Sequence, residues 1–255
     1  MNSLQKLCLN TKSVVIFDMD GTLIDSIGIW NHTDEQLLRH FGACAPSLMQ
    51  IQQERDAFLA HHADTDIYLA YCAYLKEKYA LAADPADMLA RRWEISGQYL
   101  RTQVDYKPQA ELVLQALKKA GKRLALATVT TRVQLQIYEQ ENVNLRRKAR
   151  LGEMFDLIIS KEDIVHKKPH PEIYQKVMAH FDAAPQECLV FEDSYLGVLA
   201  AKNAGIEVVN VYDAYAKPDQ AKIDSLADYQ IETYQEFLDT LCPSSSSCFF
   251  KENSV

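Results

Sequence analysis

Short apolar runs alternate with longer amphipathic segments over most of the chain. The apolar runs are rich in Val, Ile, Leu and Phe, and their hydrophobic character is nearly continuous, which is typical of strands covered by helices on both faces. The segments between most of them carry apolar positions at helical spacing. This alternation predicts a parallel α/β sheet, with strands at 13–18, 123–128, 156–160, 188–192 and 207–211.

The alternation is interrupted between the first and the second predicted strand. There the chain carries helical patterns and no strand pattern, with apolar side chains three or four residues apart. We expect these segments to form a small bundle of four helices, inserted after the first strand. The predicted helices cover 29–41, 48–62, 65–79 and 86–100.

The pattern therefore divides the chain into three parts. Residues 1–26 and 106–241 are expected to form a Rossmann-like, doubly wound α/β core, and residues 27–105 a four-helix cap. The Ser-rich segment 242–255 has few core-forming positions, and we expect it to be a disordered tail. Gly121 and Gly205 each follow a helical pattern and precede a strand, where a left-handed residue often ends a helix.

Composition and charge narrow the class of protein. A chain of 255 residues that is 48% hydrophobic can bury a sizeable core. Its net charge of −8 argues against nucleic-acid binding, which needs a positive surface. The six cysteines are scattered and form no CxxC pair, as expected of a reduced, cytoplasmic protein. The basic run at 146–150 is interpreted as a solvated face.

Two further absences support a soluble protein. The N-terminal residues lack an apolar run long enough for a signal peptide. No stretch approaches the roughly 20 apolar residues that span a bilayer. We therefore expect a cytoplasmic protein with no membrane or nucleic-acid partner, and a monomer is favoured.

The strongest chemical signal follows the first predicted strand. The sequence VVIFDMDGT places Asp18 and Asp20 one residue apart, directly after an apolar run. Ligand sites of parallel sheets form at the carboxyl ends of the strands, and an extended segment would aim both carboxylates toward one side. One carboxylate can then attack while the other transfers protons. A D-x-D alone is common at strand ends and turns, so the full strand–DxDGT context favours catalysis.

Two further candidate residues are Thr128, at the end of a predicted strand, and Lys168, just before a predicted helix. Thr128 closes the second strand, where a hydroxyl and adjoining backbone N–H groups can hold phosphate oxygens. Lys168 stands just ahead of a helix that Pro171 would start well. A lysine there can neutralise charge on a nucleophile and on a transferring phosphoryl group.

A pair of acids follows the fourth predicted strand. Glu192 and Asp193 leave an apolar run, and together with Asp18 they offer the hard oxygen ligands that Mg²⁺ prefers. Repulsion among Asp18, Asp20, Glu192 and Asp193 would be costly without a cation between them. The sequence therefore implies a bound Mg²⁺.

Taken together, these motifs resemble the four motifs of the haloacid dehalogenase superfamily. The matching segments are DMDGT, Thr128, Lys168-Pro169 and EDSYLGVLAAKNAG, in the right order, and the resemblance runs from about residue 13 to 212. The helical insertion is similar to the C1-type cap of subfamily I, in the branch that resembles β-phosphoglucomutase and the sugar-phosphate phosphatases. The family's sheet order would place strands two and four beside strand one, so that the motifs converge on Asp18.

The resemblance implies a role for each matching residue. Asp18 would attack phosphorus and form an aspartyl-phosphate, and Asp20 would serve as general acid and then base. Thr128 and Lys168 would bind the phosphoryl oxygens. Mg²⁺ would be held by Asp18, the backbone carbonyl of Asp20, Asp193 and Glu192, the last directly or through water. The implied enzyme is a phosphatase for a small phosphorylated metabolite, such as a sugar or polyol phosphate, whose leaving group the cap selects.

Several alternatives remain open. A phosphosugar mutase of the β-phosphoglucomutase type carries a cap histidine where this chain has Trp30, and His32 would not occupy the same place on a helix, so a phosphatase is favoured. The true dehalogenases lack the second aspartate, which is present as Asp20. A signalling receiver domain would carry its phosphorylated aspartate on a later strand and lack the cap. A catalytically inactive binding relative would usually lack one of the acids.

Overall fold

The structure is a computed structural model, which describes residues 3–62 and 66–241. The predicted tail, 242–255, lies outside the described residues. Contacts between Cα atoms separate two compact units, the core unit (Met1–Asp25 and Asp105–Val255) and the helical unit (Ser26–Val104). In the described part of the chain, each helix is too short or too polar to cross a membrane.

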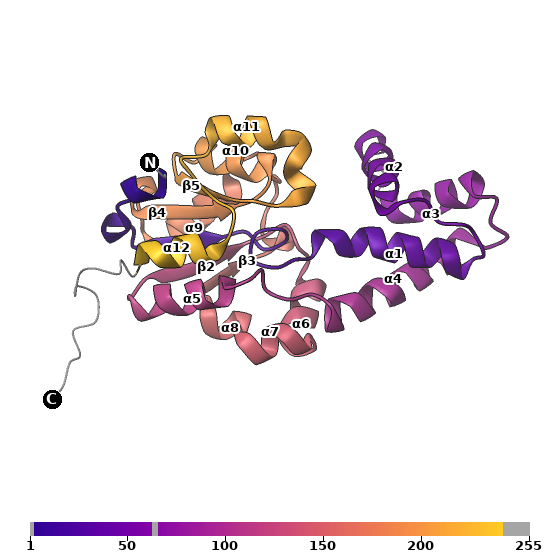
Figure 1. Cartoon of the computed structure of the whole chain (residues 1–255), viewed down its shortest axis with the longest axis horizontal. Helices are drawn as coiled ribbons and strands as arrows, with labels where there is room; N and C mark the ends of the chain where they lie inside the picture. Colours follow the sequence, from indigo (N-terminus) through magenta and orange to yellow (C-terminus); the bar gives the residue numbers. More distant parts are fainter. Residues whose placement is uncertain (1–2, 63–65, 242–255) are drawn as a thin grey trace. The chain divides into compact units, whose positions relative to one another are not determined.

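The core unit is built on a six-stranded sheet in the order β3-β2-β1-β4-β5-β6 (Figure 1). Every neighbouring pair of strands is parallel, and β1 lies between β2 and β4. The predicted doubly wound α/β fold is confirmed. The strands are β1 (Val14–Phe17), β2 (Arg123–Ala127), β3 (Leu157–Ile159), β4 (Cys188–Glu192), β5 (Glu207–Val211) and β6 (Tyr229–Ile231).

Helices cover both faces of this sheet, with α10 and α11 on one face and α5 and α8 on the other (Figure 1). Short 3-10 turns complete the connections. The helices are α5 (Ala110–Lys119), α6 (Arg132–Gln140), α7 (Val143–Lys148), α8 (Leu151–Met154), α9 (Glu172–Phe181), α10 (Tyr195–Asn203), α11 (Gln220–Leu226) and α12 (Tyr234–Leu241). The 3-10 turns are Ser3–Lys6, Leu9–Thr11, Lys161–Asp163, Pro185–Glu187 and Ala214–Asp219.

Alternating side chains of β1 pack into the two layers on either side of the sheet. Val14 and Ile16 join a buried cluster that includes Ile173 of α9. On the same strand, Phe17 stacks on Phe191 of β4, with ring centroids 4.6 Å apart. All four residues of β1 are completely buried, so burial on both faces accounts for the unbroken apolar run in the sequence.

Two predicted helix ends are confirmed by backbone geometry. Gly121 follows α5 with φ of 73°, and Gly205 follows α10 with φ of 76°. Both are left-handed conformations that glycine adopts without the steric penalty of a Cβ atom. Each helix therefore ends where its glycine turns the chain back toward the sheet, into β2 and β5 respectively.

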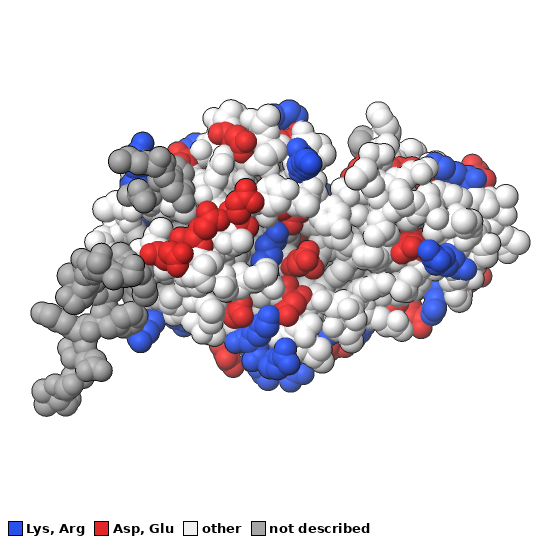
Figure 2. All heavy atoms as spheres, viewed as in Figure 1, with Lys and Arg blue, Asp and Glu red and all other residues white. Residues whose placement is uncertain are grey.

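The prediction missed one strand, and it placed no helices at α7, α8, α11 or α12. The sheet has a further edge strand, β6, whose three residues alternate buried, exposed and buried. The segment before β3 forms α7 and α8, and the basic side chains Arg146 and Arg147 on α7 are exposed. On the face that Figure 2 shows, Lys and Arg side chains are interspersed with Asp and Glu and form no continuous basic surface among the described residues.

The described residues of the helical unit form four helices, as the periodicity predicted. Three of them begin with a side-chain cap from Ser47, Asp66 or Asp84, each accepting a hydrogen bond from a backbone N–H of the first turn. Their apolar faces enclose a common core of Leu37, Leu38, Tyr71, Cys72, Leu75, Leu81, Met88 and Ile95. The helices are α1 (Ile27–His40), α2 (Leu48–His61), α3 (Ile67–Lys78) and α4 (Pro85–Thr102).

A buried ion-pair network joins three of these helices. The Asp34 carboxylate of α1 accepts hydrogen bonds from Arg92 Nε of α4 at 2.7 Å and from Arg55 Nη1 of α2 at 3.1 Å. Arg55 also donates to Asn31 Oδ1 at 2.8 Å. Both Asp34 and Arg92 are fully buried, so each charge depends on the other for compensation.

We expect the Asp34→Asn variant to lose about 3–5 kcal/mol of the free energy of unfolding, because two buried guanidinium groups lose their counter-charge. Both tryptophans, Trp30 and Trp93, lie in the helical unit, so urea unfolding followed by tryptophan fluorescence reports on it. The matched control is Glu35→Gln on the same helix, whose partner Arg39 is largely exposed and which should cost at most about 1 kcal/mol. Equal losses for the two variants would refute a structural role for the buried network.

Candidate active site

The chain turns back on itself directly after β1 and presents two aspartates there. The backbone N–H of Asp18 still donates to the Phe191 carbonyl at 3.0 Å, which keeps Asp18 aligned with the sheet. The Met19 carbonyl then accepts N–H bonds from Leu23 at 2.9 Å and Ile24 at 3.1 Å. Gly21, with φ of 82°, allows this reversal. The local sequence DMDGT therefore holds Asp18 and Asp20 at the carboxyl edge of the central strand.

The Lys168 side chain reaches this edge from the loop before α9. Its ammonium group donates to Asp18 Oδ1 at 2.6 Å, to Glu192 Oε1 at 2.5 Å and to the Ala127 carbonyl at 3.2 Å. These three acceptors match the three protons of the ammonium group. Burial alone would lower the pKa of Lys168, but the carboxylates of Asp18 and Glu192 hold that pKa well above its usual range. Lys168 is thus a fixed positive charge beside Asp18.

Glu192 is completely buried and both of its carboxylate oxygens are engaged. Besides Lys168, Oε1 accepts the Tyr174 hydroxyl at 3.0 Å. Oε2 accepts from the backbone N–H of Asp193 at 3.1 Å and from the N–H and hydroxyl of Ser194 at 3.2 and 3.1 Å. This arrangement fixes Glu192 and, through it, the position of the Lys168 ammonium group.

Asp193 completes a cluster of three buried carboxylates. Its Oδ1 accepts the Thr22 hydroxyl at 2.6 Å, and the residue is 5% exposed. Oxygen atoms of Asp18, Glu192 and Asp193 lie within 4.8 Å of one another. Burial, opposed by the Lys168 ammonium group, raises the pKa of Asp18 to about 7. Burial and, next, the Glu192 carboxylate raise the pKa of Asp193 well above its usual range.

The donor set of this cluster fits a divalent cation. When ionised, Asp18, Glu192 and Asp193 carry three negative charges and Lys168 one positive charge, which leaves an excess of two negative charges in a buried site. Burial is the main cause of the raised pKa values of Asp18 and Asp193. A bound cation would favour the ionised form of both carboxylates. Hard carboxylate oxygens are the ligands that Mg²⁺ and similar ions take.

Asp20 and Thr128 are connected through a residue that the sequence did not single out. The Thr128 hydroxyl donates to Thr130 Oγ1 at 2.9 Å and accepts the Thr130 backbone N–H at 3.0 Å. The Thr130 hydroxyl in turn donates to Asp20 Oδ2. The loop after β2 is therefore tied to the turn after β1, and Asp20 is held by a hydroxyl from that loop.

The predicted site residues form two groups. Asp18, Lys168, Glu192 and Asp193 are joined by direct contacts, whereas Asp20 and Thr128 meet through Thr130. The sequence analysis gave no role to several contributors: Thr22, Thr130, Tyr174, Ser194 and Gly197. Of these, Thr22 lies within DMDGT, and Ser194 and Gly197 lie within EDSYLGVLAAKNAG, so their positions in the motifs were an available signal.

Gly197 of α10 is required by the packing of Glu192. A Cβ atom at position 197 would lie 1.9–2.2 Å from three atoms of the Glu192 carboxyl group. Alanine is intrinsically favoured over glycine in a helix by about 1 kcal/mol. We nevertheless expect Gly197→Ala to destabilise the chain by about 1–3 kcal/mol, because the buried carboxylate must shift.

Urea unfolding measures this loss. Gly152→Ala in α8 is the matched control, since its added Cβ would meet only the end of the Glu139 side chain, at 3.4 Å. An unchanged or higher stability of the Gly197→Ala variant would show that Glu192 does not need this close approach.

Comparisons with known proteins find related sequences over most of the chain. The sequence pattern of the haloacid dehalogenase-like hydrolases matches residues 15–211. The probable pseudouridine-5'-phosphatase of Drosophila melanogaster is 27% identical, over 86% of this chain and 92% of its own length. Pyrophosphatase PpaX of Bacillus mycoides is 25% identical, over 85% of this chain and 94% of its own.

Solved structures share the fold. The crystal structure of a putative β-phosphoglucomutase from Thermotoga maritima superposes with a TM-score of 0.74 at 25% identity, covering 90% of this chain and 98% of that one. Because the family pattern spans more than half of the sequence, including most of β1 and all of β4, the chain belongs to the haloacid dehalogenase-like hydrolases. The resemblance inferred from the motifs is confirmed, as is the expectation of an enzyme of the hydrolase class.

Proposed function

We propose that this protein is a Mg²⁺-dependent phosphatase, which hydrolyses a small phosphomonoester through an aspartyl-phosphate on Asp18. The observation that carries the proposal is the Asp18 carboxylate at the end of β1, with the Lys168 ammonium group on one oxygen and two further acids within 4.8 Å. The family match and the names of two relatives, a pyrophosphatase and a probable pseudouridine-5'-phosphatase, support phosphate chemistry.

In the first step, Asp18 attacks phosphorus. Lys168 occupies Oδ1, so we assign the attack to Oδ2 of the same carboxylate. A new Asp18–phosphorus bond forms as the bond from phosphorus to the leaving oxygen breaks. Lys168 balances the negative charge that the transferring phosphoryl group brings to the site. Asp20, held by the Thr130 hydroxyl, gives a proton to the leaving alkoxide.

In the second step, water cleaves the aspartyl-phosphate. Asp20, now ionised, accepts a proton from the attacking water, which releases inorganic phosphate and regenerates the Asp18 carboxylate. The Thr128 hydroxyl and the backbone N–H groups beside it are assigned to the phosphoryl oxygens. The hydrogen bond between Thr130 and Asp20 keeps the proton-transferring group in one orientation through both steps.

Asp18 and Asp193 are the side chains that we assign to Mg²⁺, together with the backbone carbonyl of Asp20. Mg²⁺ supplies charge neutralisation and orientation for the phosphoryl oxygens when it is bound. The Glu192 oxygens already accept five hydrogen bonds, so we assign Glu192 to holding Lys168 and to contacting the ion through water. Glu192 therefore has a task that differs from that of the two metal-binding aspartates.

Removal of divalent metal should abolish turnover. We expect EDTA to reduce phosphate release from p-nitrophenyl phosphate to background and Mg²⁺ to restore it, because the buried acids otherwise carry uncompensated charge. A panel of sugar and polyol phosphates then identifies the substrate class. Conversion of a sugar phosphate into its positional isomer without phosphate release would instead favour a phosphomutase, the class that the name of the similar Thermotoga maritima protein indicates. Turnover that persists without metal would overturn the assignment.

A further inference from the structure

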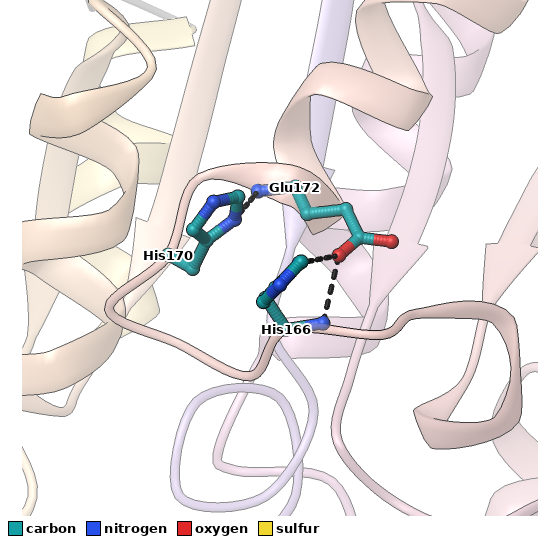
Figure 3. Close-up of side chains that lie close together, drawn as sticks. All are labelled: His166, His170 and Glu172. Atoms are coloured by element: carbon teal, nitrogen blue, oxygen red, sulfur yellow. Dashed lines mark hydrogen bonds and ion pairs between the residues drawn. The ribbon is translucent and has the colours of Figure 1, made fainter.

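A second group of metal-ligating side chains lies on the loop that carries Lys168 and at the start of α9. His166, His170 and Glu172 gather there, with one ligand atom from each within 4.8 Å of the others (Figure 3). The imidazole rings stack with centroids 4.4 Å apart. His166 Nδ1 lies 3.0 Å from Glu172 Oε2. The proposed phosphatase mechanism uses none of these three side chains.

Backbone contacts hold the Glu172 carboxylate in place. Its oxygens accept the N–H groups of Val165 at 3.0 Å and His166 at 2.7 Å. Lys176, one turn along α9, lies 3.2 Å from Oε1. Oε2 is the carboxylate oxygen beside the His166 ring. Oε1 is held by the Val165 N–H and lies near the Lys176 ammonium group. Metal-binding carboxylates are commonly oriented by outer hydrogen bonds of this kind.

The loop between the two histidines is also fixed. The His170 backbone N–H donates to the Lys167 carbonyl at 3.0 Å, and the Asn203 side-chain amide donates to the Pro169 carbonyl at 3.0 Å. The Glu172 N–H donates to His170 Nδ1 at 3.2 Å (Figure 3). Both rings are therefore presented from a loop whose backbone is tied to α9 and α10.

The chemistry of these three groups differs from that of the buried acids. Hydrogen bonds from the Val165 and His166 N–H groups lower the pKa of Glu172 to about 2, so the carboxylate is ionised at neutral pH. Two imidazoles and one carboxylate form a donor set that suits Zn²⁺, Ni²⁺ or Cu²⁺, whereas Mg²⁺ prefers oxygen alone. Both histidines line an open hollow of about 720 Å³, which leaves room for water as a further ligand.

We propose that His166, His170 and Glu172 bind one divalent transition-metal ion of the Zn²⁺ type, at a site separate from the buried acids. The two histidines stand two residues before and two residues after Lys168. An ion bound by both histidines joins the two ends of segment 166–170, which carries Lys168. Metal binding at this site therefore clamps the Lys168 loop onto α9, whatever the substrate of the enzyme.

Zn²⁺ titration of the full chain tests the site directly. The protein is first saturated with Mg²⁺ to occupy the acidic cluster, and Zn²⁺ is then added in competition with a chromophoric chelator. We expect one equivalent to bind. His166→Ala, His170→Ala and Glu172→Gln should each weaken that binding by about tenfold or more. Co²⁺ bound to the wild type should give a visible absorption band that the variants lose.

Controls separate this site from other zinc ligands. His180→Ala removes an exposed histidine of α9 and should leave the affinity unchanged. Glu172→Gln keeps an oxygen for only one of the Val165 and His166 N–H bonds, which end on Oε1 and Oε2. His166→Ala and His170→Ala leave both bonds in place, so the loop should stay folded in the two histidine variants. If wild type and all three variants bind Zn²⁺ equally, the ion sits elsewhere, for example on the exposed Cys8 or Cys44, and the proposal fails. It fails equally if no equivalent binds.

Hydrogen–deuterium exchange tests the clamp. Zn²⁺ should slow exchange of the backbone amides at 164–170 in the wild type and leave it unchanged in the His170→Ala variant. Tight binding of Zn²⁺ without this protection would overturn the clamp. Neither measurement uses catalysis, so failure of the phosphatase assignment would leave both results interpretable.

Discussion

Asp18→Asn is expected to lower the rate of phosphate release by at least about 10⁴-fold, because the amide removes the nucleophile and the other acids are assigned to the metal, to Lys168 and to proton transfer. Glu192 has both oxygens engaged, and Asp193 Oδ1 is held by Thr22. The substitution preserves the size of the side chain and removes a buried charge, so the fold should be retained.

Steady-state turnover and circular dichroism of the purified variant measure both effects. Asp239→Asn, which changes an exposed acid of α12 in the same way, is the matched control and should leave turnover unchanged. Substantial residual activity in a folded Asp18→Asn variant would move the nucleophile to another residue. Substrate binding that persists in the variant would show that the loss of turnover is catalytic and not caused by unfolding.

Lys168→Met is expected to reduce turnover by about 10³-fold and to destabilise the chain by about 3–5 kcal/mol. The ammonium group is the only partner that joins the Asp18 and Glu192 carboxylates among the described residues, and its side chain is 7% exposed. Its removal leaves two buried carboxylates facing each other. Turnover falls because the transferring phosphoryl group loses its fixed positive charge.

A double variant separates the two effects of Lys168. Adding Glu192→Gln to Lys168→Met removes one of the unpaired charges, so stability should recover in part while turnover stays low. Lys167→Met is the matched control, because the neighbouring lysine is exposed and should tolerate the change in both assays. If Lys168→Met alone unfolds no more easily than the wild type, the buried pairing is not structural. If it retains turnover, the assignment of Lys168 to the phosphoryl group is wrong.

Much of the fold was predictable because burial on both faces leaves a strong mark in the sequence. The strands β1 and β4 are apolar at nearly every position, and both were located to within a residue. The edge strand β6 was missed because it has only three residues and its middle position, Gln230, is exposed. Short edge strands carry neither a continuous apolar run nor an extended alternation, so periodicity alone does not reveal them.

The site was predictable where its residues occupy strand ends, and not where they meet through tertiary contacts. Asp18 and Glu192 end neighbouring strands, so the sheet brings them together. The hydrogen bond from Tyr174 to Glu192 and the close approach of Gly197 depend on how α9 and α10 pack against β4, which spacing does not encode. Thr130 was overlooked because a threonine in a Thr-rich loop carries no signal of its own until the turn after β1 is placed beside it.

The histidine cluster also could not be predicted from sequence spacing. His166 and His170 were visible in the sequence beside Lys168, but they lie four positions apart in a loop, and no helical period places them together. Only the folded loop and the Glu172 carboxylate at the start of α9 bring the rings into contact. Loop ligands of this kind are found by structure, since their geometry depends on individual backbone hydrogen bonds.

Chemical trapping of the covalent intermediate decides whether Asp18 carries the phosphoryl group. The full chain is mixed with Mg²⁺ and a phosphomonoester that it turns over, quenched, and treated with borohydride, which reduces an acyl phosphate to an alcohol. Mass spectrometry of the peptides should then find the reduced side chain at position 18, only when substrate was present. Reduction at another acid, or none during active turnover, would contradict an aspartyl-phosphate on Asp18.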